Sequence, residues 1–265
     1  MSTSIAQKMS RQGQWFQPAE ADPDASIRLL LFPHAGSGAI IYRDWPELLP
    51  RDIGAQALTL PGRQERRGEQ AFTEWEPLVE GLYEAVLATN DNRPFAFYGH
   101  CLGAQLAYEL AVRMERDGVQ GPLMVGMSGW APKGFFCPTE EHIEMPTDEL
   151  ISWIKRLGSF PADIYDNPEM LAMVIPALRS DLSVAAQRKD HGALVPCPLV
   201  SYGGKNDGLQ EEDDAFQSWV PRSPQYLGHR EYPGGHFFID SHAEAITQDF
   251  CSHLYRLAAA AKKLT

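Results

Sequence analysis

The sequence predicts an α/β fold in which helices cover both faces of a mostly parallel sheet. Short apolar runs alternate with segments of helical spacing along most of the 265 residues, which is the pattern of a parallel sheet with crossover helices. Hydrophobic residues make up 44% of the chain, enough to build a sizeable core. Between one apolar run and the helix after it lies Gly99-His100-Cys101-Leu102-Gly103, a pattern typical of a nucleophile on a tight strand-to-helix turn.

The first half of the chain supplies three of the expected strands. Residues 1–25 are rich in proline and small polar side chains, and we expect them to form a flexible leader. Apolar runs that end at proline or glycine then predict buried strands, at Ile27–Phe32, Ile53–Leu60 and Pro94–Tyr98. Apolar residues at helical spacing predict helices between and after them, at about Ala39–Leu49, Trp75–Asn90 and Ala104–Ala111.

The second half continues the alternation but interrupts it once. The expected strands are Leu123–Ser128, Pro198–Gly203 and Tyr226–Tyr232, and the helices that follow the last two are Glu211–Trp219 and Ala243–Ala261. Residues 134–192 hold only helical patterns, at Asp148–Leu157 and Pro168–Gln187, and are rich in Pro and Met. We interpret 134–192 as a helical lid inserted into a core made of 26–133 and 193–265; the alternative is an extra helical pair that gates nothing.

Composition excludes several classes of function. The formal net charge of −12 argues against nucleic acid as the main partner. No run approaches the ~18 apolar residues of a membrane span, and residues 1–20 lack the apolar region of a secretory signal. The four cysteines are scattered, so neither a metal site nor a disulfide framework is predicted. We therefore expect a cytoplasmic protein, a monomer, without a cofactor of its own.

The glycine-flanked cysteine has a physical reason for its neighbours. A nucleophile elbow exposes its side chain at the carboxyl edge of the sheet, and a Cβ at Gly99 or Gly103 would crowd that turn. The alternative is a buried, inert thiol, since cysteine packs like a small hydrophobe. The strand before Cys101 and the helix after it favour the nucleophile.

A nucleophile of this kind needs a base, and the base needs an orienting acid. In α/β-hydrolases the chain order is nucleophile, then Asp or Glu, then His. After Cys101 the chain offers Asp207 and then His236, each in a glycine-rich loop just past an expected strand. Both loops would lie at the edge where ligands bind in such sheets.

Other side chains compete for these two roles. His100 adjoins the nucleophile but would point away from it on a tight turn. His229 falls within an expected strand and His242 opens a helix, so neither has a loop that lets the ring reach over the sheet edge. Asp213 and Asp214 fall in an expected helix and are more typical of a solvated face.

An oxyanion hole needs two backbone N–H donors. The residue after the nucleophile, Leu102, supplies one, helped by the positive end of its helix. The loop His34–Gly38 after the first expected strand should supply the other, and we assign it to Ala35. This loop is not a phosphate-binding loop, because no Gly-Lys-Ser/Thr follows it.

Several separated motifs together resemble the type II thioesterases, the stand-alone thioesterases of polyketide and nonribosomal peptide pathways. The resemblance runs from about Ile27 to Leu257. The motifs are Phe32 to Ser37, Leu60 to Arg66, Gly99 to Ala104, Ile175 to Asp181, Gly204 to Asp207 and Gly235 to Phe237. It implies an α/β-hydrolase fold and a thioester hydrolase. Its substrates would be acyl or aminoacyl groups on the 4'-phosphopantetheine arm of an acyl or peptidyl carrier protein.

The chain departs from that family at Cys101, where the family typically has serine. A branch with a similar fold uses cysteine to transfer acyl or aminoacyl groups between carrier proteins, so an acyl-Cys101 intermediate could pass its group to water or to a second carrier. Polyester synthases also have a cysteine here but are longer and lack the other motifs. A serine replaced by cysteine to trap an acyl-enzyme is a further alternative. A non-catalytic binding module would have no reason to keep the acid and the base.

Two groups of residues are expected to bind the substrate or its carrier. Met145, Phe160 and Met173 could line an acyl tunnel under the lid, or could simply be lid core. Arg63 and Arg66 could meet an acidic carrier or the pantetheine phosphate, or could be solvated loop charges.

Overall fold

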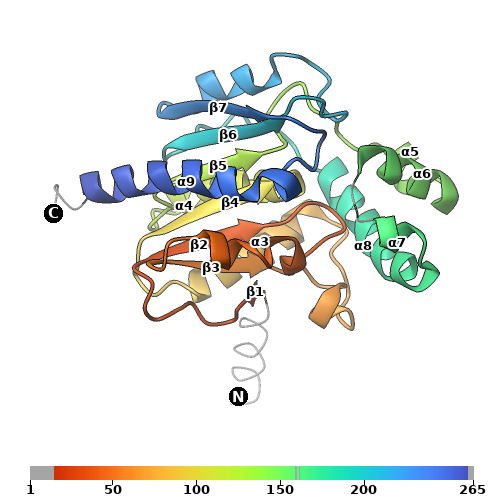
Figure 1. The fold of residues 1–265 in the computed structure, drawn as a ribbon, viewed down its shortest axis with the longest axis horizontal. Helices are drawn as coiled ribbons and strands as arrows, with labels where there is room; N and C mark the ends of the chain where they lie inside the picture. Colours follow the sequence, from red (N-terminus) through yellow and green to blue (C-terminus); the bar gives the residue numbers. More distant parts are fainter. Residues whose placement is uncertain (1–14, 159, 161, 262–265) are drawn as a thin grey trace.

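The computed structural model describes residues 15–158, 160 and 162–261. Within them, seven strands form one sheet of order β1-β3-β2-β4-β5-β6-β7 (Figure 1). All neighbouring strands are parallel except β1, which runs antiparallel to β3. The strands are Phe16–Gln17 (β1), Ile27–Phe32 (β2), Ile53–Leu58 (β3), Phe95–His100 (β4), Val125–Ser128 (β5), Leu199–Gly204 (β6) and Tyr226–Tyr232 (β7). The structure is an α/β-hydrolase fold, as predicted.

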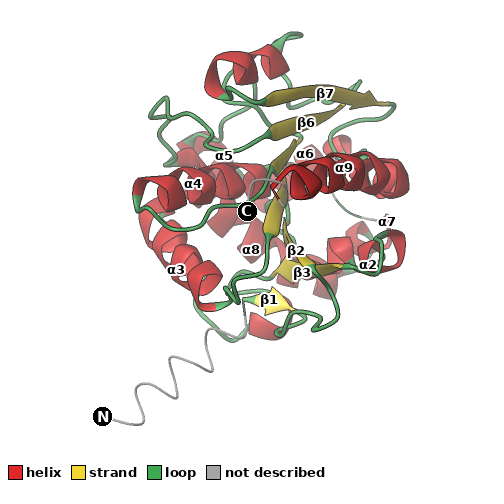
Figure 2. Ribbon diagram, turned by 90° about the vertical axis from the view of Figure 1, so that its left-hand side faces the viewer, coloured by secondary structure: helices red, strands yellow, loops and turns green. Residues whose placement is uncertain are grey.

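Helices cover both faces of the sheet (Figure 2). One face carries Trp75–Ala88 (α3) and Leu102–Arg116 (α4), and the opposite face carries Trp45–Leu48 (α2) and Ile239–Ala261 (α9). Every residue of β2 and β4 is buried, because helices on both faces leave neither side of a central parallel strand to solvent.

Two hydrophobic cores lie on the two faces of the sheet, and β4 contributes side chains to both. Its Phe97 packs with Leu82 and Leu106 of α3 and α4. The next residue, Tyr98, packs with Trp45 and Phe250 of α2 and α9. Successive strand side chains point to opposite faces, so this alternation fixes the sheet between its helical layers.

Four helices gather at one end of the sheet (Figure 1, green to teal). They are Glu140–Glu144 (α5), Thr147–Leu157 (α6), Ala162–Tyr165 (α7) and Pro168–Ala186 (α8). Leu150 and Ile154 of α6 pack against Leu178 and Leu182 of α8 in a small core of their own. The sequence predicted α6 and α8 and missed the two shorter helices.

Both edges of the sheet are irregular. The sequence predicted a flexible leader over residues 1–25, and the structure corrects this for Trp15 to Gln17. Trp15 and Phe16 are buried, and Phe16–Gln17 pairs with β3. Residues 1–14 of the leader lie outside the described residues. At the other edge, β7 carries a bulge where its register against β6 shifts, and Gly228 there has φ +102°.

Two expected helices are different in the structure. The stretch expected as Ala39–Leu49 divides into a 3-10 helix, Ala39–Tyr42 (η1), and α2, because Pro46 in the first turn of α2 starts a new helix and cannot continue the previous one. Glu211–Trp219 is instead a turn followed by a 3-10 helix, Ala215–Arg222 (η3). A further short 3-10 helix is Gln64–Arg66 (η2). No helix of the described residues is long and apolar enough to cross a membrane.

Candidate active site

The turn between β4 and α4 holds Cys101 in a strained conformation. Cys101 has φ +56° and ψ −117°, a region that side-chain-bearing residues adopt rarely and mostly at functional sites. A Cβ on Gly103 would lie 2.0 Å from the carbonyl oxygen of Phe32, and one on Gly99 would lie 2.2 Å from that of Gly103. Both contacts are with backbone, so only glycine fits at either position, as the sequence predicted.

Asp207 and His236 meet at the same edge of the sheet. Asp207 follows β6 and His236 follows β7. The His236 Nδ1–H donates to Asp207 Oδ2 at 2.7 Å, and their side chains are 1% and 0% exposed. The other carboxylate oxygen accepts from the Leu209 N–H at 2.9 Å. The acid therefore fixes the orientation of the imidazole ring.

The second ring nitrogen of His236 is aimed at the nucleophile. Nε2 is buried and makes no hydrogen bond of ordinary geometry within the described residues. Burial lowers the pKa of His236, but the negative charges of Cys101 and then Asp207 outweigh it and raise this pKa to about 10. The raised pKa favours a protonated His236 ring beside Cys101.

Two further buried histidines lie next to His236 and are neutral. The His100 ring is 5.0 Å from that of His236, and its Nδ1 shares a hydrogen bond of 2.8 Å with Ser128 Oγ. Burial, and then the charge on His236, hold the pKa of His100 well below its usual value. Burial likewise lowers the pKa of His34 to about 4. His100 therefore packs against the His236 ring.

The other competitors are engaged elsewhere. His229 stacks on Phe216 with ring centroids 3.9 Å apart, and His242 Nε2–H donates to the carbonyl oxygen of Pro233. Asp213 and Asp214 lie exposed in the turn before η3. None of the four lines the cavity that contains Cys101.

The two expected oxyanion donors both line the cavity of the nucleophile. Leu102 is the first residue of α4, so its N–H has no partner within the helix. Ala35 follows β2, in the loop 34–38 where Gly36 has φ +78°. Within the described residues, neither N–H donates to a protein acceptor. Both residues line the cavity of Cys101.

That cavity has a volume of about 60 Å³ and is mostly apolar. Besides the residues already described, its walls include Trp130, Phe136, Trp153 and Leu182. One polar side chain was missed from the sequence: Gln105, which is 8% exposed and has no hydrogen-bond partner for its amide within the described residues. The signal was its position four residues after Cys101, on the same face of α4.

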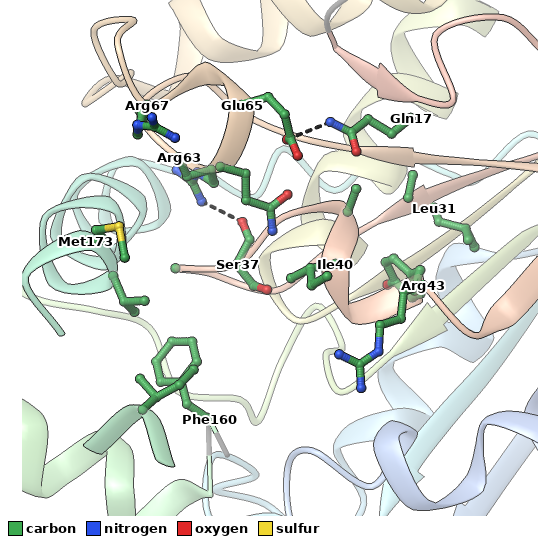
Figure 3. A pocket seen from close by; sticks show the side chains of 18 of the residues that line it. Gln17, Leu31, Ser37, Ile40, Arg43, Arg63, Glu65, Arg67, Phe160 and Met173 are labelled. Atoms are coloured by element: carbon green, nitrogen blue, oxygen red, sulfur yellow. Dashed lines mark hydrogen bonds between the residues drawn. The ribbon is translucent and has the colours of Figure 1, made fainter. Parts of the chain in front are cut away.

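A larger cavity of about 880 Å³ lies between loop 34–38 and the lid helices (Figure 3). Its lining includes Phe160 and Met173 but not Cys101 or His236. The chemistry therefore belongs to the smaller cavity, despite the difference in size. Met145 lines neither cavity; it packs in the small core between the lid helices.

The structure corrects the expected binding role of Arg63 and Arg66. Both are buried, at 6% and 4% exposure, rather than free on a surface loop. Arg63 pairs with Asp181, and Arg66 pairs with Glu69 and donates to the carbonyl oxygen of Thr59 at 3.0 Å. Guanidinium groups paired in this way are held as structural contacts and are not available to a soluble anion.

The fold and the site together define an enzyme of the α/β-hydrolase class. The sheet places an elbow nucleophile, an orienting carboxylate and a histidine at one edge, in the chain order of that class. No cluster of three or more His, Cys, Asp or Glu side chains in the described part of the chain is placed to hold a metal ion.

Comparison with known proteins identifies the family. Residues 27–254 match the thioesterase domain family, so the chain belongs to it and is a thioester hydrolase. The gramicidin S biosynthesis protein GrsT of Aneurinibacillus migulanus is 29% identical over 256 residues, covering 96% of this chain and 98% of that protein. The thioesterase PikA5 of Streptomyces venezuelae is 29% identical and covers 91% of this chain and 86% of its own length.

A solved structure supports the same placement. The type II thioesterase BorB, from the borrelidin biosynthetic cluster, superposes with a TM-score of 0.79 at 27% identity, covering 91% of this chain and 97% of that one. The fold and the family therefore agree.

Proposed function

We propose that this enzyme cleaves acyl or aminoacyl thioesters from the phosphopantetheine arm of a carrier protein, through a covalent acyl-Cys101 intermediate. The observation that carries the proposal is the buried His236–Asp207 pair directed at a cysteine in elbow geometry. The names of two relatives, the gramicidin S biosynthesis protein GrsT and the type II thioesterase BorB from the borrelidin biosynthetic cluster, support a carrier-bound substrate.

Acylation begins from the thiolate–imidazolium pair. The Cys101 sulfur attacks the thioester carbonyl, and the resulting oxyanion accepts hydrogen bonds from the N–H groups of Ala35 and Leu102. Collapse breaks the bond to the pantetheine sulfur, which takes the proton of His236. The products are an acyl-Cys101 thioester, a free pantetheine thiol and a neutral histidine.

Deacylation depends on the change in charge at Cys101. Once acylated, the sulfur carries no negative charge, so the largest influence that raises the pKa of His236 is removed. The neutral imidazole can then accept a proton from a water that attacks the acyl carbonyl. Expulsion of Cys101 as thiolate releases the acid and restores the ion pair.

The cavity limits the size of the acyl group. A volume of about 60 Å³ holds only a few waters at about 10–15 Å³ each, so short acyl groups fit and long chains do not. Its aromatic and aliphatic walls favour an apolar body, while the Gln105 amide offers one hydrogen-bonding partner.

Transfer to a second carrier is the alternative outcome, and the identity of the nucleophile favours it. Exchange of one thioester for another conserves the reactivity of the acyl group, whereas an ester at serine would not. Acyl-Cys101 can therefore be attacked by a second pantetheine thiol as well as by water.

One experiment tests both outcomes. A carrier protein loaded with a radiolabelled short acyl or aminoacyl group is mixed with the enzyme and an empty second carrier, and the label is followed. Free acid supports hydrolysis, and label on the second carrier shows transfer instead. If the label stays on the first carrier, and intact-mass analysis finds no adduct at Cys101, the proposed function is refuted.

A further inference from the structure

The lid helix α8 reaches into the active-site loop through one buried carboxylate. Asp181, in the second half of α8, is 1% exposed. Its Oδ2 accepts a hydrogen bond of 2.7 Å from the backbone N–H of Gly36. Gly36 is the residue after Ala35, which lines the nucleophile's cavity. A lid side chain therefore ends on the loop expected to supply an oxyanion donor.

Arg63 completes the contact from the opposite side. Its guanidinium donates from Nη1 to Asp181 Oδ2 at 2.5 Å and from Nη2 to Asp181 Oδ1 at 2.7 Å. Nη1 also donates to the carbonyl oxygen of Ser37 at 2.9 Å (Figure 3). The Arg63–Asp181 pair therefore holds loop 34–38 at two points: Asp181 accepts from the Gly36 N–H, and Arg63 donates to the Ser37 carbonyl oxygen. Arg63 and Asp181 are 118 positions apart in the chain.

The peptide unit between Ala35 and Gly36 is held at both of its polar groups. The Gly36 N–H is taken by Asp181, and the Ala35 carbonyl oxygen accepts from His34 Nδ1–H at 2.9 Å. These two bonds fix the plane of the 35–36 peptide. The Ala35 N–H belongs to the preceding peptide, which is joined to this plane at the Ala35 Cα, so a shift of the 35–36 peptide would also shift the Ala35 N–H. Asp181 therefore acts on that N–H indirectly, without lining the cavity of Cys101.

We propose that Asp181, supported by Arg63, is a positioning residue that aims the Ala35 N–H at the oxyanion of the acylation step. The inference rests on the proposed function only for the role of that N–H. It assigns to α8 a task beyond covering the site: the oxyanion hole is complete only while the second half of this helix is docked.

The test compares two reactions of the same thiol. Attack of Cys101 on a small activated thioester, 4-nitrothiophenyl acetate, develops an oxyanion and releases a coloured thiolate. Alkylation of Cys101 by iodoacetamide displaces iodide and develops none. Both are measured for the full-length enzyme and for Asp181→Ala, Asp181→Asn and a control, Ser183→Ala. Ser183 lies on the same helix and donates to the Thr73 carbonyl oxygen at 3.0 Å, without touching loop 34–38.

We expect Asp181→Ala to slow acylation by about 10²-fold to 10³-fold, the loss typical of one oxyanion donor, and to leave alkylation within about 2-fold of the parent rate. Asp181→Asn keeps an acceptor for the Gly36 N–H and should lose less. Ser183→Ala should change neither rate. Circular dichroism establishes that each variant is folded.

Three results would overturn the proposal. The first is acylation at the parent rate in both Asp181→Asn and Asp181→Ala. The second is an equal slowing of acylation and alkylation in the folded Asp181→Asn protein, and the third is a loss of acylation without loss of alkylation in Ser183→Ala. The carrier-protein assay decides the proposed function separately, because 4-nitrothiophenyl acetate needs no carrier. An enzyme that fails on carriers but shows the selective loss would keep the positioning role and lose the proposed substrate.

Discussion

At the scale of single residues, a negative charge on Cys101 is the largest of the influences that raise the pKa of His236. The ring is buried and its only strong partners are the thiol and Asp207. The same histidine can therefore be an imidazolium in the resting enzyme and a neutral base after acylation, without any movement of the backbone.

This coupling predicts a titration that responds to modification of the thiol. In the free enzyme, the His236 ring should titrate near pH 10, because the raised pKa keeps it protonated below that value. Capping Cys101 with methyl methanethiosulfonate removes the negative charge, and the pKa of His236 should fall. The measurement is the ¹³Cε1 chemical shift of the ring against pH, before and after capping. An unchanged titration would show that Cys101 does not raise this pKa.

The amide of Gln105 predicts a substrate preference. Gln105→Leu removes the unpartnered amide from a mostly apolar cavity, so lactoyl thioesters should lose about 1 kcal/mol of transition-state binding relative to propanoyl thioesters. The ratio of kcat/KM for the two substrates measures this, with an expected change of about 5-fold toward propanoyl. The control is Gln248→Leu, at an exposed side chain bonded to Glu244. Equal ratios in parent and Gln105→Leu would contradict the role.

The sequence predicted the three residues that the structure brings together at the sheet edge, but not the residues that support them. Cys101, Asp207 and His236 could be found because chain order and glycine-flanked loops point to them. The roles of Arg63 and Asp181 could not, because each depends on the other across two separate segments. In the sequence, Arg63 looked like a surface cation; only the fold shows that a carboxylate of the lid buries it.

At the scale of elements, the crossing of β2 and α4 predicts which glycines are indispensable. Gly103→Ala would place a Cβ 2.0 Å from the backbone oxygen of Phe32, and neither element can yield without loss of core packing. We expect it to lower the free energy of unfolding by more than about 4 kcal/mol, measured by urea denaturation. Gly68→Ala is the matched control, since its Cβ would meet nothing within 4 Å, and should change stability by less than about 0.5 kcal/mol. Similar stabilities for the two variants would refute this account of the elbow.

The edge strand β1 predicts that part of the expected leader contributes to stability. Phe16 is 1% exposed, so Phe16→Ala should cost about 3–5 kcal/mol. Glu20→Ala, at an exposed residue nearby, should leave the free energy of unfolding unchanged. The measurement is the midpoint of urea denaturation for each of the two variants. Equal midpoints for Phe16→Ala and Glu20→Ala would support the original interpretation of a loose leader.

Sequence patterns located the long elements and failed on the short ones. Strands such as Ile27–Phe32 and Tyr226–Tyr232 have enough residues to show an apolar run. β1 has two residues, too few for any periodicity, and is a strand only because β3 pairs with it. In the same way, η1 and α2 are separate because Pro46 starts a new helix, a break that apolar spacing alone does not reveal.

At the scale of the whole molecule, the lid consists of two parts with different attachments. The second half of α8 is tied to the core by Asp181, and by Ser183 and Gln187, which both donate to the Thr73 carbonyl oxygen. By contrast, α5 has no buried residue.

Hydrogen exchange should separate these two parts. We expect amides in 177–186 to be protected at least about 10-fold more than those in 140–144, because α5 has no buried residue and buried contacts raise the free energy of local opening. Mass spectrometry of peptides from the two segments measures this. Equal protection would mean that 134–192 opens as one body, as first expected for a lid.

The two edge strands of the sheet, β1 and β7, affect whether copies of this protein associate through their sheets. An exposed strand edge normally offers a row of unpaired N–H and C=O groups to a neighbour, and aggregation begins there. Here one outermost strand is two residues long, and the other is bent by the bulge at Gly228 and carries charged Arg230 and Glu231 beyond it. Neither edge presents a long flat ladder, so the sheet resists extension by another chain even at the high concentrations reached during synthesis.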